Sequence, residues 1–184
     1  MTTRNIVPRA DGEGKIGTTT KRWGEAHFDI VELGGGQIAF PSTQAPSADP
    51  NTLDDYEEGT WTPDLQFGGA KVDITYANQD GLYTKVGRVV IATAFFTLTS
   101  KGSSVGAATI HGLPFTVKND LAAFSPTSAY INKISFADFF QLFADINSTN
   151  IDLREVTNAG VVTTITNANF ANDSSIMISF CYFV

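Results

Sequence analysis

The segment from Arg88 to Ser100 restricts the possible folds of this chain most strongly. Apolar side chains occur at both sets of its alternate positions. One set is Val89, Ile91, Thr93, Phe95 and Thr97, and the other is Val90, Ala92, Ala94, Phe96 and Leu98. Successive side chains of a strand point to opposite faces, so such a strand needs cover on both sides. The segment is predicted to be a central strand of a β-sandwich or a strand at a subunit interface.

Short alternating segments, separated by turn residues, surround this strand. They are predicted at residues 61–67, 72–76, 82–86, 107–113, 128–136, 139–146, 151–156, 161–165 and 175–184. The residues at 78–81 and 157–160 have turn composition. Residues 136–143 also fit helical spacing, although the neighbouring segments favour a strand there. The pattern predicts an all-β fold, a jelly-roll-like β-sandwich of about eight to ten strands.

The first 40 residues differ from this domain. Residues 4–24 are basic and rich in glycine and threonine, with few large apolar side chains. Ordering each residue costs about 1–2 kcal/mol, which so little apolar surface does not repay in a single chain. We therefore predict an arm for attachment and trimerisation at 1–40, a proline-rich linker at 41–54 and a β-sandwich domain at 55–184. The arm residues expected to contact other copies or another protein are Arg4, Ile6, Val7, Arg9, Ile16, Arg22 and Trp23.

Charge is unevenly distributed along the chain. The net charge is −7, yet residues 1–22 hold five basic and two acidic residues, so this segment is at +3 and the remainder of the chain at −10. An acidic main domain argues against nucleic acid as a partner. The single cysteine, Cys181, excludes an intrachain disulfide, and its apolar neighbours predict a buried thiol. The sequence has no secretion signal and no apolar run long enough to span a membrane, so no membrane insertion is expected.

Residues suited to catalysis are sparse. His27 and His111 are the only histidines, and neither lies near a nucleophile signature. A single acidic cluster, at the junction of linker and domain, contains Asp54, Asp55, Glu57 and Glu58. Adjacent acids at such a junction are typical of a solvated corner rather than of a glycosidase pair. We predict no catalytic residue, no cofactor and no metal site.

Glycan contact is a further hypothesis, because sugar sites use aromatic rings beside polar side chains. The candidate residues are Tyr56, Tyr76, Tyr83 and Tyr130. Packing in the core is the alternative for each of them.

Two ordered sets of residues also suggest a family. The first is Asn5–Gly17, which reads Asn-Ile-Val-Pro-Arg-Ala-Asp-Gly-Glu-Gly-Lys-Ile-Gly, followed by Lys21–Gly24. The second is Asp55–Pro63, which reads Asp-Tyr-Glu-Glu-Gly-Thr-Trp-Thr-Pro, followed by Gly81–Gly87 and Gly112–Phe115. The first set resembles a trimeric shaft module of tailed-bacteriophage fibre proteins, and the second resembles a domain that follows such shafts.

The resemblance implies a homotrimeric structural protein of a virion, assembled in the bacterial cytoplasm and displayed on the particle. No large tail-attachment segment precedes the shaft-like module in this sequence, which leaves two sites of attachment open. One is the phage tail, where the protein would be a tail fibre that binds a receptor or glycan on the host surface. The other is the capsid, where it would be a head fibre or a decoration trimer with a structural role.

Overall fold

The computed structural model describes residues 20–21, 26–32, 36–40, 43, 47, 49, 51–127 and 129–184. The chain divides into two units, residues 1–39 and 40–184. In the described part of the first unit, residues 26–32 and 36–39 form neither helix nor strand. The apolar side chains of Phe28, Ile30 and Val31 are exposed within this unit.

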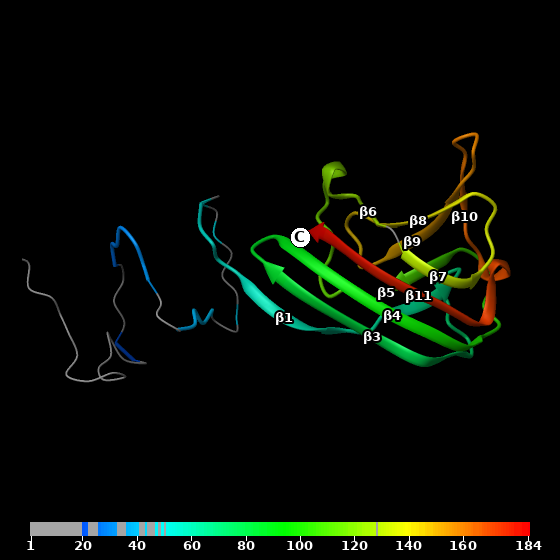
Figure 1. Ribbon diagram of the computed structural model, residues 1–184, viewed down its shortest axis with the longest axis horizontal. Helices are drawn as coiled ribbons and strands as arrows, with labels where there is room; N and C mark the ends of the chain where they lie inside the picture. The colour runs from blue at the N-terminus through cyan, green and yellow to red at the C-terminus, as the bar shows by residue number, and fades with distance from the viewer. Residues whose placement is uncertain are drawn as a thin grey trace, which may run out of the picture. The chain divides into compact units, whose positions relative to one another are not determined.

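The second unit consists of two antiparallel sheets (Figure 1). The order in sheet A is β1 (Tyr56–Trp61), β3 (Ile74–Val86), β4 (Val89–Lys101), β11 (Phe170–Phe183) and β7 (Ala129–Ile134). The order in sheet B is β2 (Asp64–Phe67), β5 (Ala108–His111), β9 (Ile151–Val156), β8 (Phe139–Ala144) and β6 (Ser125–Thr127), with β10 (Val162–Thr164) also beside β9. Two short 3₁₀ helices, η1 (Leu121–Ala123) and η2 (Asn167–Asn169), interrupt the connections. The all-β prediction is confirmed.

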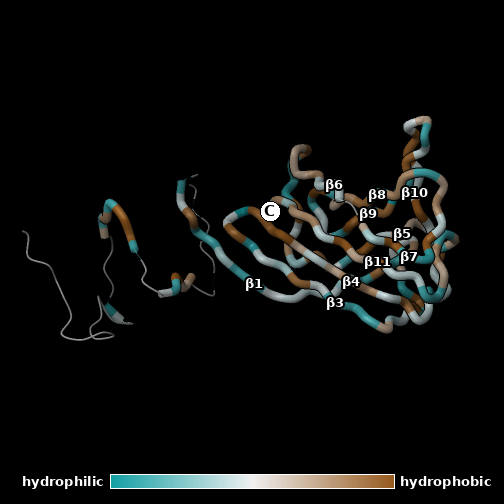
Figure 2. The backbone as a smooth tube through the Cα atoms, in the orientation of Figure 1, coloured by the Kyte–Doolittle hydropathy of each residue, from teal (hydrophilic) through white to brown (hydrophobic). Residues whose placement is uncertain are grey.

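The central strand expected from Arg88 to Ser100 is β4, which pairs with β3 on one side and β11 on the other. Its residues Val90, Ala92, Ala94, Phe96 and Leu98 are buried in one core with side chains from sheet B. Apolar colour marks the β3–β4 hairpin and the start of β4 in Figure 2. The alternate residues of β4 lie on the outer face of sheet A, so only one of the two apolar sets is covered within a single chain.

The turn expected at residues 78–81 is wrong. Strand β3 continues through these residues, and irregular pairing near Tyr76 and Asn78 takes up the change of register with β4. The chain reverses instead at Gly87 and Arg88, between the paired residues Val86 and Val89. Gly87 has a φ of 55°, which glycine adopts without steric cost at the first central position of a two-residue hairpin.

Three further expectations are resolved, two in sheet B and one at the linker. Residues 139–144 form a strand, so the helical alternative for 136–143 does not apply. The turn at 157–160 is confirmed, with the amide of Gly160 donating to the carbonyl of Thr157 at 2.8 Å. The solvated corner expected at the acidic cluster is wrong, because Tyr56–Trp61 is strand β1 and Asp55 is only 2% exposed. Its burial has a specific partner, the ammonium group of Lys85.

Strand β1 is held to β3 by two pairs of a glycine and an aromatic residue. Gly59 lies opposite Tyr83, and Trp61 lies opposite Gly81. A Cβ atom on Gly81 would come within 2.6 Å of Trp61 Nε1, so the missing side chain is what lets the indole lie across β3. From this position Trp61 Nε1 donates to the carbonyl of Thr93 on β4 at 3.0 Å.

Gly112–Phe115, the third segment of the second ordered set of residues, also contacts the aromatic residues that lie across β1 and β3. The ring of Phe115 packs edge-on against Tyr83, with 5.4 Å between the ring centroids. The backbone amide of Phe115 donates to the hydroxyl of Tyr182 at 3.3 Å. Just before it, Gly112 has a φ of 93° and leaves no room for a Cβ atom beside the carbonyl of Thr62. Segments distant in the sequence therefore meet at one corner of the core.

Replacing Gly81 with Ala should lower the free energy of unfolding by about 1–3 kcal/mol, because the new methyl group displaces a buried indole. Chemical denaturation followed by Trp fluorescence measures this loss. The matched control is Asp80→Asn, an exposed substitution in the same strand, which should change stability by less than about 0.5 kcal/mol. Equal stability of Gly81→Ala and the wild type would show that the glycine is not needed for the Trp61 contact.

Candidate interaction surfaces

The outer face of sheet A is rich in apolar side chains. Cross-strand pairing places residues of β3, β4 and β11 in rows, such as Val86, Val89 and Phe183. Leu82 is 62% exposed, Ile91 52% and Met177 50%. We call this surface the apolar face, and its large residues are Leu82, Val86, Ile91, Phe95, Met177 and Phe183.

A shallow hollow of about 290 Å³ lies in the apolar face. Leu82, Phe95 and Met177 contribute to its walls, and Thr93 and Ser179 add small polar groups. An apolar surface of this kind is more typical of a sheet face that packs against another layer than of a sheet face in contact with solvent. It therefore has the composition of a surface that another protein covers.

Cys181 lies in this surface, which corrects the expectation of a buried thiol. Its side chain is exposed, and it pairs in register with Ile91 of β4. The apolar residues around it in the sequence belong to two faces, of which one, with Phe180 and Tyr182, is buried in the core. The apolar residues next to Cys181 in the sequence therefore predicted a buried thiol, whereas the single chain leaves this side chain exposed.

The outer face of sheet B has the opposite character. Polar side chains occupy the outward positions of neighbouring strands, in register across the sheet. We call this surface the polar face, and its residues are Asp64, Gln66, Thr109, His111, Gln141, Asp152 and Arg154. Sequence reasoning did not single it out as a surface, although polar residues at alternate positions of short strands were a readable signal.

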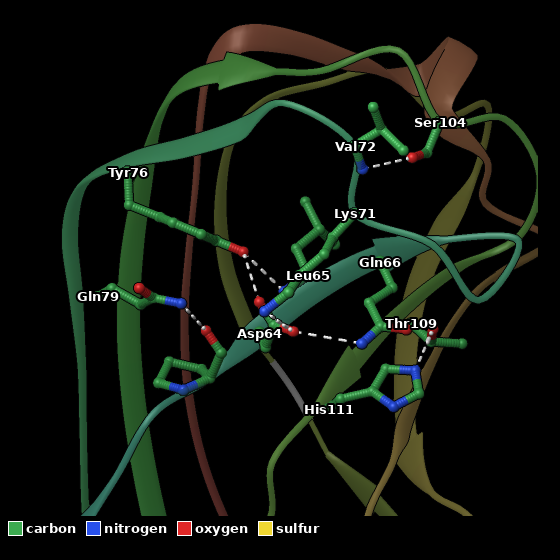
Figure 3. A network of polar contacts seen from close by, with 11 residues as sticks. Asp64, Leu65, Gln66, Lys71, Val72, Tyr76, Gln79, Ser104, Thr109 and His111 are labelled. Carbon is green, nitrogen blue, oxygen red and sulfur yellow. Dashed lines mark hydrogen bonds and ion pairs between the residues drawn. The ribbon is translucent and has the colours of Figure 1, made fainter.

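The side chains of the polar face are linked by hydrogen bonds and ion pairs (Figure 3). Lys71 Nζ lies 2.9 Å from Asp64 Oδ2, and Gln66 Nε2 donates to the same oxygen at 3.2 Å. Thr109 Oγ1 and His111 Nε2 are 2.9 Å apart, in a hydrogen bond of either direction. These contacts join neighbouring side chains along β2 and along β5.

A second group on the polar face centres on Arg154. Its Nη2 atom lies 2.8 Å from Asp152 Oδ2, and its guanidinium group lies 4.3 Å from the centre of the Phe143 ring. The ring and the carboxylate orient the guanidinium, and the Arg154 side chain is 38% exposed. The polar face therefore offers donors and acceptors beside an aromatic ring.

The four tyrosines considered for glycan contact do not share one surface. Tyr76 packs edge-on against Phe96, and burial raises the pKa of its phenol to about 12. The phenol of Tyr83 donates to Glu57, which raises the pKa of Tyr83 to about 12, and its ring packs against Phe115. Tyr56 and Tyr130 are exposed, on strands at opposite edges of sheet A.

The arm residues predicted to make contacts, Arg4, Ile6, Val7, Arg9, Ile16, Arg22 and Trp23, lie outside the described residues. Within the described ranges, no group of three or more His, Cys, Asp or Glu side chains is placed to hold a metal ion. The described part of the chain also has no helix with the length and apolar character needed to cross a membrane.

Comparisons with protein families, with curated proteins and with solved structures find no match to this chain.

His111 should make stability depend on pH. Burial lowers the pKa of His111 below its ordinary value of 6.5, although the charges of Asp64 and Asp152 oppose the change. As the pH falls below 6.5, the unfolded chain binds a proton before the folded chain does, so the free energy of unfolding should decrease. Urea unfolding on either side of this pH measures the loss.

The variant His111→Gln should show a weaker decrease over the same pH interval, because it has no imidazole to protonate. His27→Gln, in the first unit, is the control and should retain the profile of the wild type. A profile for His111→Gln that coincides with that of the wild type would mean that other groups cause the pH dependence.

Proposed function

We propose that this chain is a structural fibre protein of a tailed-phage virion and acts as a homotrimer. The observation that supports the proposal best is the apolar face, whose side chains are exposed in the single chain although they lie on a regular, well-paired sheet. Fully covering a Leu, Ile or Met side chain contributes about 1.5–3 kcal/mol. Further copies of the chain are the occupant that we propose for this surface.

The distribution of charge supports other copies as the occupant. Each chain has a net charge of −7, so copies repel one another unless they meet where acidic groups are few. On the outer side of sheet A, Glu58 lies on the edge strand β1, and Asp80, which pairs with Phe95, is the one acidic residue among the described residues that line the hollow. Three sheets arranged around a threefold axis would bury the apolar faces and keep the polar faces outside.

The arm completes the proposed assembly. Phe28, Ile30 and Val31 are exposed in the described part of the first unit, in a segment without regular structure. We propose that neighbouring copies of the chain order this segment by covering these side chains. The resemblance of residues 5–24 to a fibre shaft module supports the same proposal. In this proposal residues 1–24, the basic part of the arm, bind another virion protein, and the domain that follows is a jelly-roll-like head.

Between the two sites of attachment, we favour a tail fibre that contacts the host surface. The polar face remains outside when the apolar face is covered, and its hydrogen-bonding groups beside Phe143 suit sugar hydroxyls or a polar protein surface. Tyr56 and Tyr130 pair with Val86 and Met177 of the apolar face, so they lie on the side of the sheet that the proposed trimer covers and are not part of this glycan surface. The alternative is a head fibre or decoration trimer on the capsid, in which the polar face faces solvent without a ligand.

Purified protein should have a mass near that of three chains by light scattering. Ile91→Lys places a charge in the centre of the apolar face, so it should reduce the trimer to monomers and expose Cys181 to a maleimide. The matched control is Gln141→Lys, an exposed substitution on the polar face, which should leave the trimer and the protection of Cys181 unchanged. A wild-type monomer at micromolar concentration, with a reactive Cys181, would contradict the proposal.

Removing residues 1–24 should prevent incorporation into particles. The truncated chain keeps every strand described above, so its circular dichroism should still be that of a β protein. Labelled full-length protein imaged on virions would show whether it lies on the tail or on the capsid. Truncated protein that joins virions at normal copy number would exclude the arm as the anchor, and failure to find the full-length protein on any particle would refute the virion assignment.

A further inference from the structure

We propose that Lys85 and Asp55 join through an amide bond between their side chains, which links strands β3 and β1 covalently. Their side chains already form an ion pair at the corner where the two strands begin and end. Glu57, which lies opposite Lys85, is proposed to move the proton that the reaction requires. This inference does not depend on the oligomeric state or on the proposed function.

The backbone brings the three residues together. Asp55 immediately precedes β1, and its carbonyl accepts a hydrogen bond from the amide of Gly87 at 2.7 Å. In the register of β1 and β3, Glu57 is directly opposite Lys85, so Asp55 is diagonal to Lys85 on the same side of the sheet. Contact between the reacting groups is therefore part of the fold and needs no rearrangement.

The pair lies in a nearly water-free environment. The side chain of Lys85 is 8% exposed and that of Asp55 is 3% exposed. The Phe115 ring covers the ammonium group, with 5.5 Å from Nζ to the ring centre. Among the described residues, neither carboxylate oxygen of Asp55 has a hydrogen-bond partner in addition to this ion pair. Burial of this kind penalises the charged forms of both groups, because it removes the water that would solvate them.

Burial has the corresponding effect on the lysine. It lowers the pKa of Lys85 below its ordinary value, against the opposing charge of Asp54. An uncharged amine is a nucleophile, whereas an ammonium group is not. The arrangement thus favours the two uncharged reactants, an amine and a carboxylic acid, in contact with each other.

The reaction needs no other substrate. The Nζ lone pair of Lys85 attacks Cγ of the protonated Asp55 carboxyl group, and a bond between Nζ and Cγ forms. Glu57 accepts a proton from Nζ and passes it to the departing hydroxyl group, so the bond from Cγ to this oxygen breaks and one water molecule leaves. The phenol of Tyr83 donates to the Glu57 carboxylate and holds it on this side of the sheet. No electrons are gained or lost overall.

Mass spectrometry of the intact protein tests the proposal. The folded wild type should be lighter than its sequence by the mass of one water molecule. Lys85→Arg keeps the positive charge but has no reactive amine, so its mass should match its sequence. Glu57→Gln keeps Lys85 and Asp55, and it should lose water more slowly after refolding while its circular dichroism stays that of the folded protein.

Tryptic digestion locates the bond. Linked Lys85 resists trypsin, so residues 23–71 and 72–88 should appear as one branched peptide. The pair of Lys71 and Asp64, with 2.9 Å between Nζ and Oδ2 and a Lys71 side chain that is 61% exposed, is an internal control that should stay unlinked and be cleaved after Lys71. Cleavage after Lys85 in the wild type, together with an unchanged intact mass, would overturn the proposal. That outcome is decisive even if the variants fail to fold, because the wild type alone supplies it.

Discussion

The pairing of β1 with β3 is the contact on which the rest of this domain depends. Gly59 and Gly81 give up their side chains so that Tyr83 and Trp61 lie across the paired strands, and each ring then reaches a further element of the core. Trp61 bonds to β4, and Tyr83 packs on Phe115. Without this pairing, sheet A would begin at β3, and the connection from β1 to β2 in sheet B would have no fixed origin.

Sheets A and B cover the core from opposite sides, and their two outer faces differ in chemistry. Sheet A contains the long strands β3, β4 and β11, whose outward positions hold Leu82, Ile91 and Met177. Sheet B is built from shorter strands with carboxylate, amide and guanidinium groups outside. A chain that exposes both faces to water gains nothing from the first, whereas an assembly that covers the first still presents the second. This asymmetry is the physical basis for proposing an assembled protein.

Local patterns in the sequence predicted the strands better than they predicted the contacts. Strand β9 was expected at 151–156 and lies there, and β4 and β11 were expected from their strict alternation. The turn expected at 78–81 failed because the role of Gly81 is set by Trp61, which lies twenty residues earlier in the chain. Asp55 was expected in solvent for the same reason, since its partner Lys85 is distant in the sequence.

The candidate surfaces were only partly readable. The two apolar sets of β4 indicated a covered outer face, but they did not distinguish a second sheet from a second subunit. Cys181 is exposed because the single chain does not cover this face of β11. The polar face required the register of β2, β5 and β9, which brings together pairs such as Gln66 and Thr109 that no local pattern connects.

The entry of the chain into β1 also has a mechanical consequence. The arm and linker lead directly into an edge strand, and the first backbone bond of that strand joins the carbonyl of Asp55 to the amide of Gly87. If the arm is fixed to a particle while the sandwich is held elsewhere, tension enters sheet A at this bond. An edge strand has one neighbour, so it detaches by peeling unless its first residue is anchored. Asp55 and Lys85 provide that anchor at the point where the pull begins.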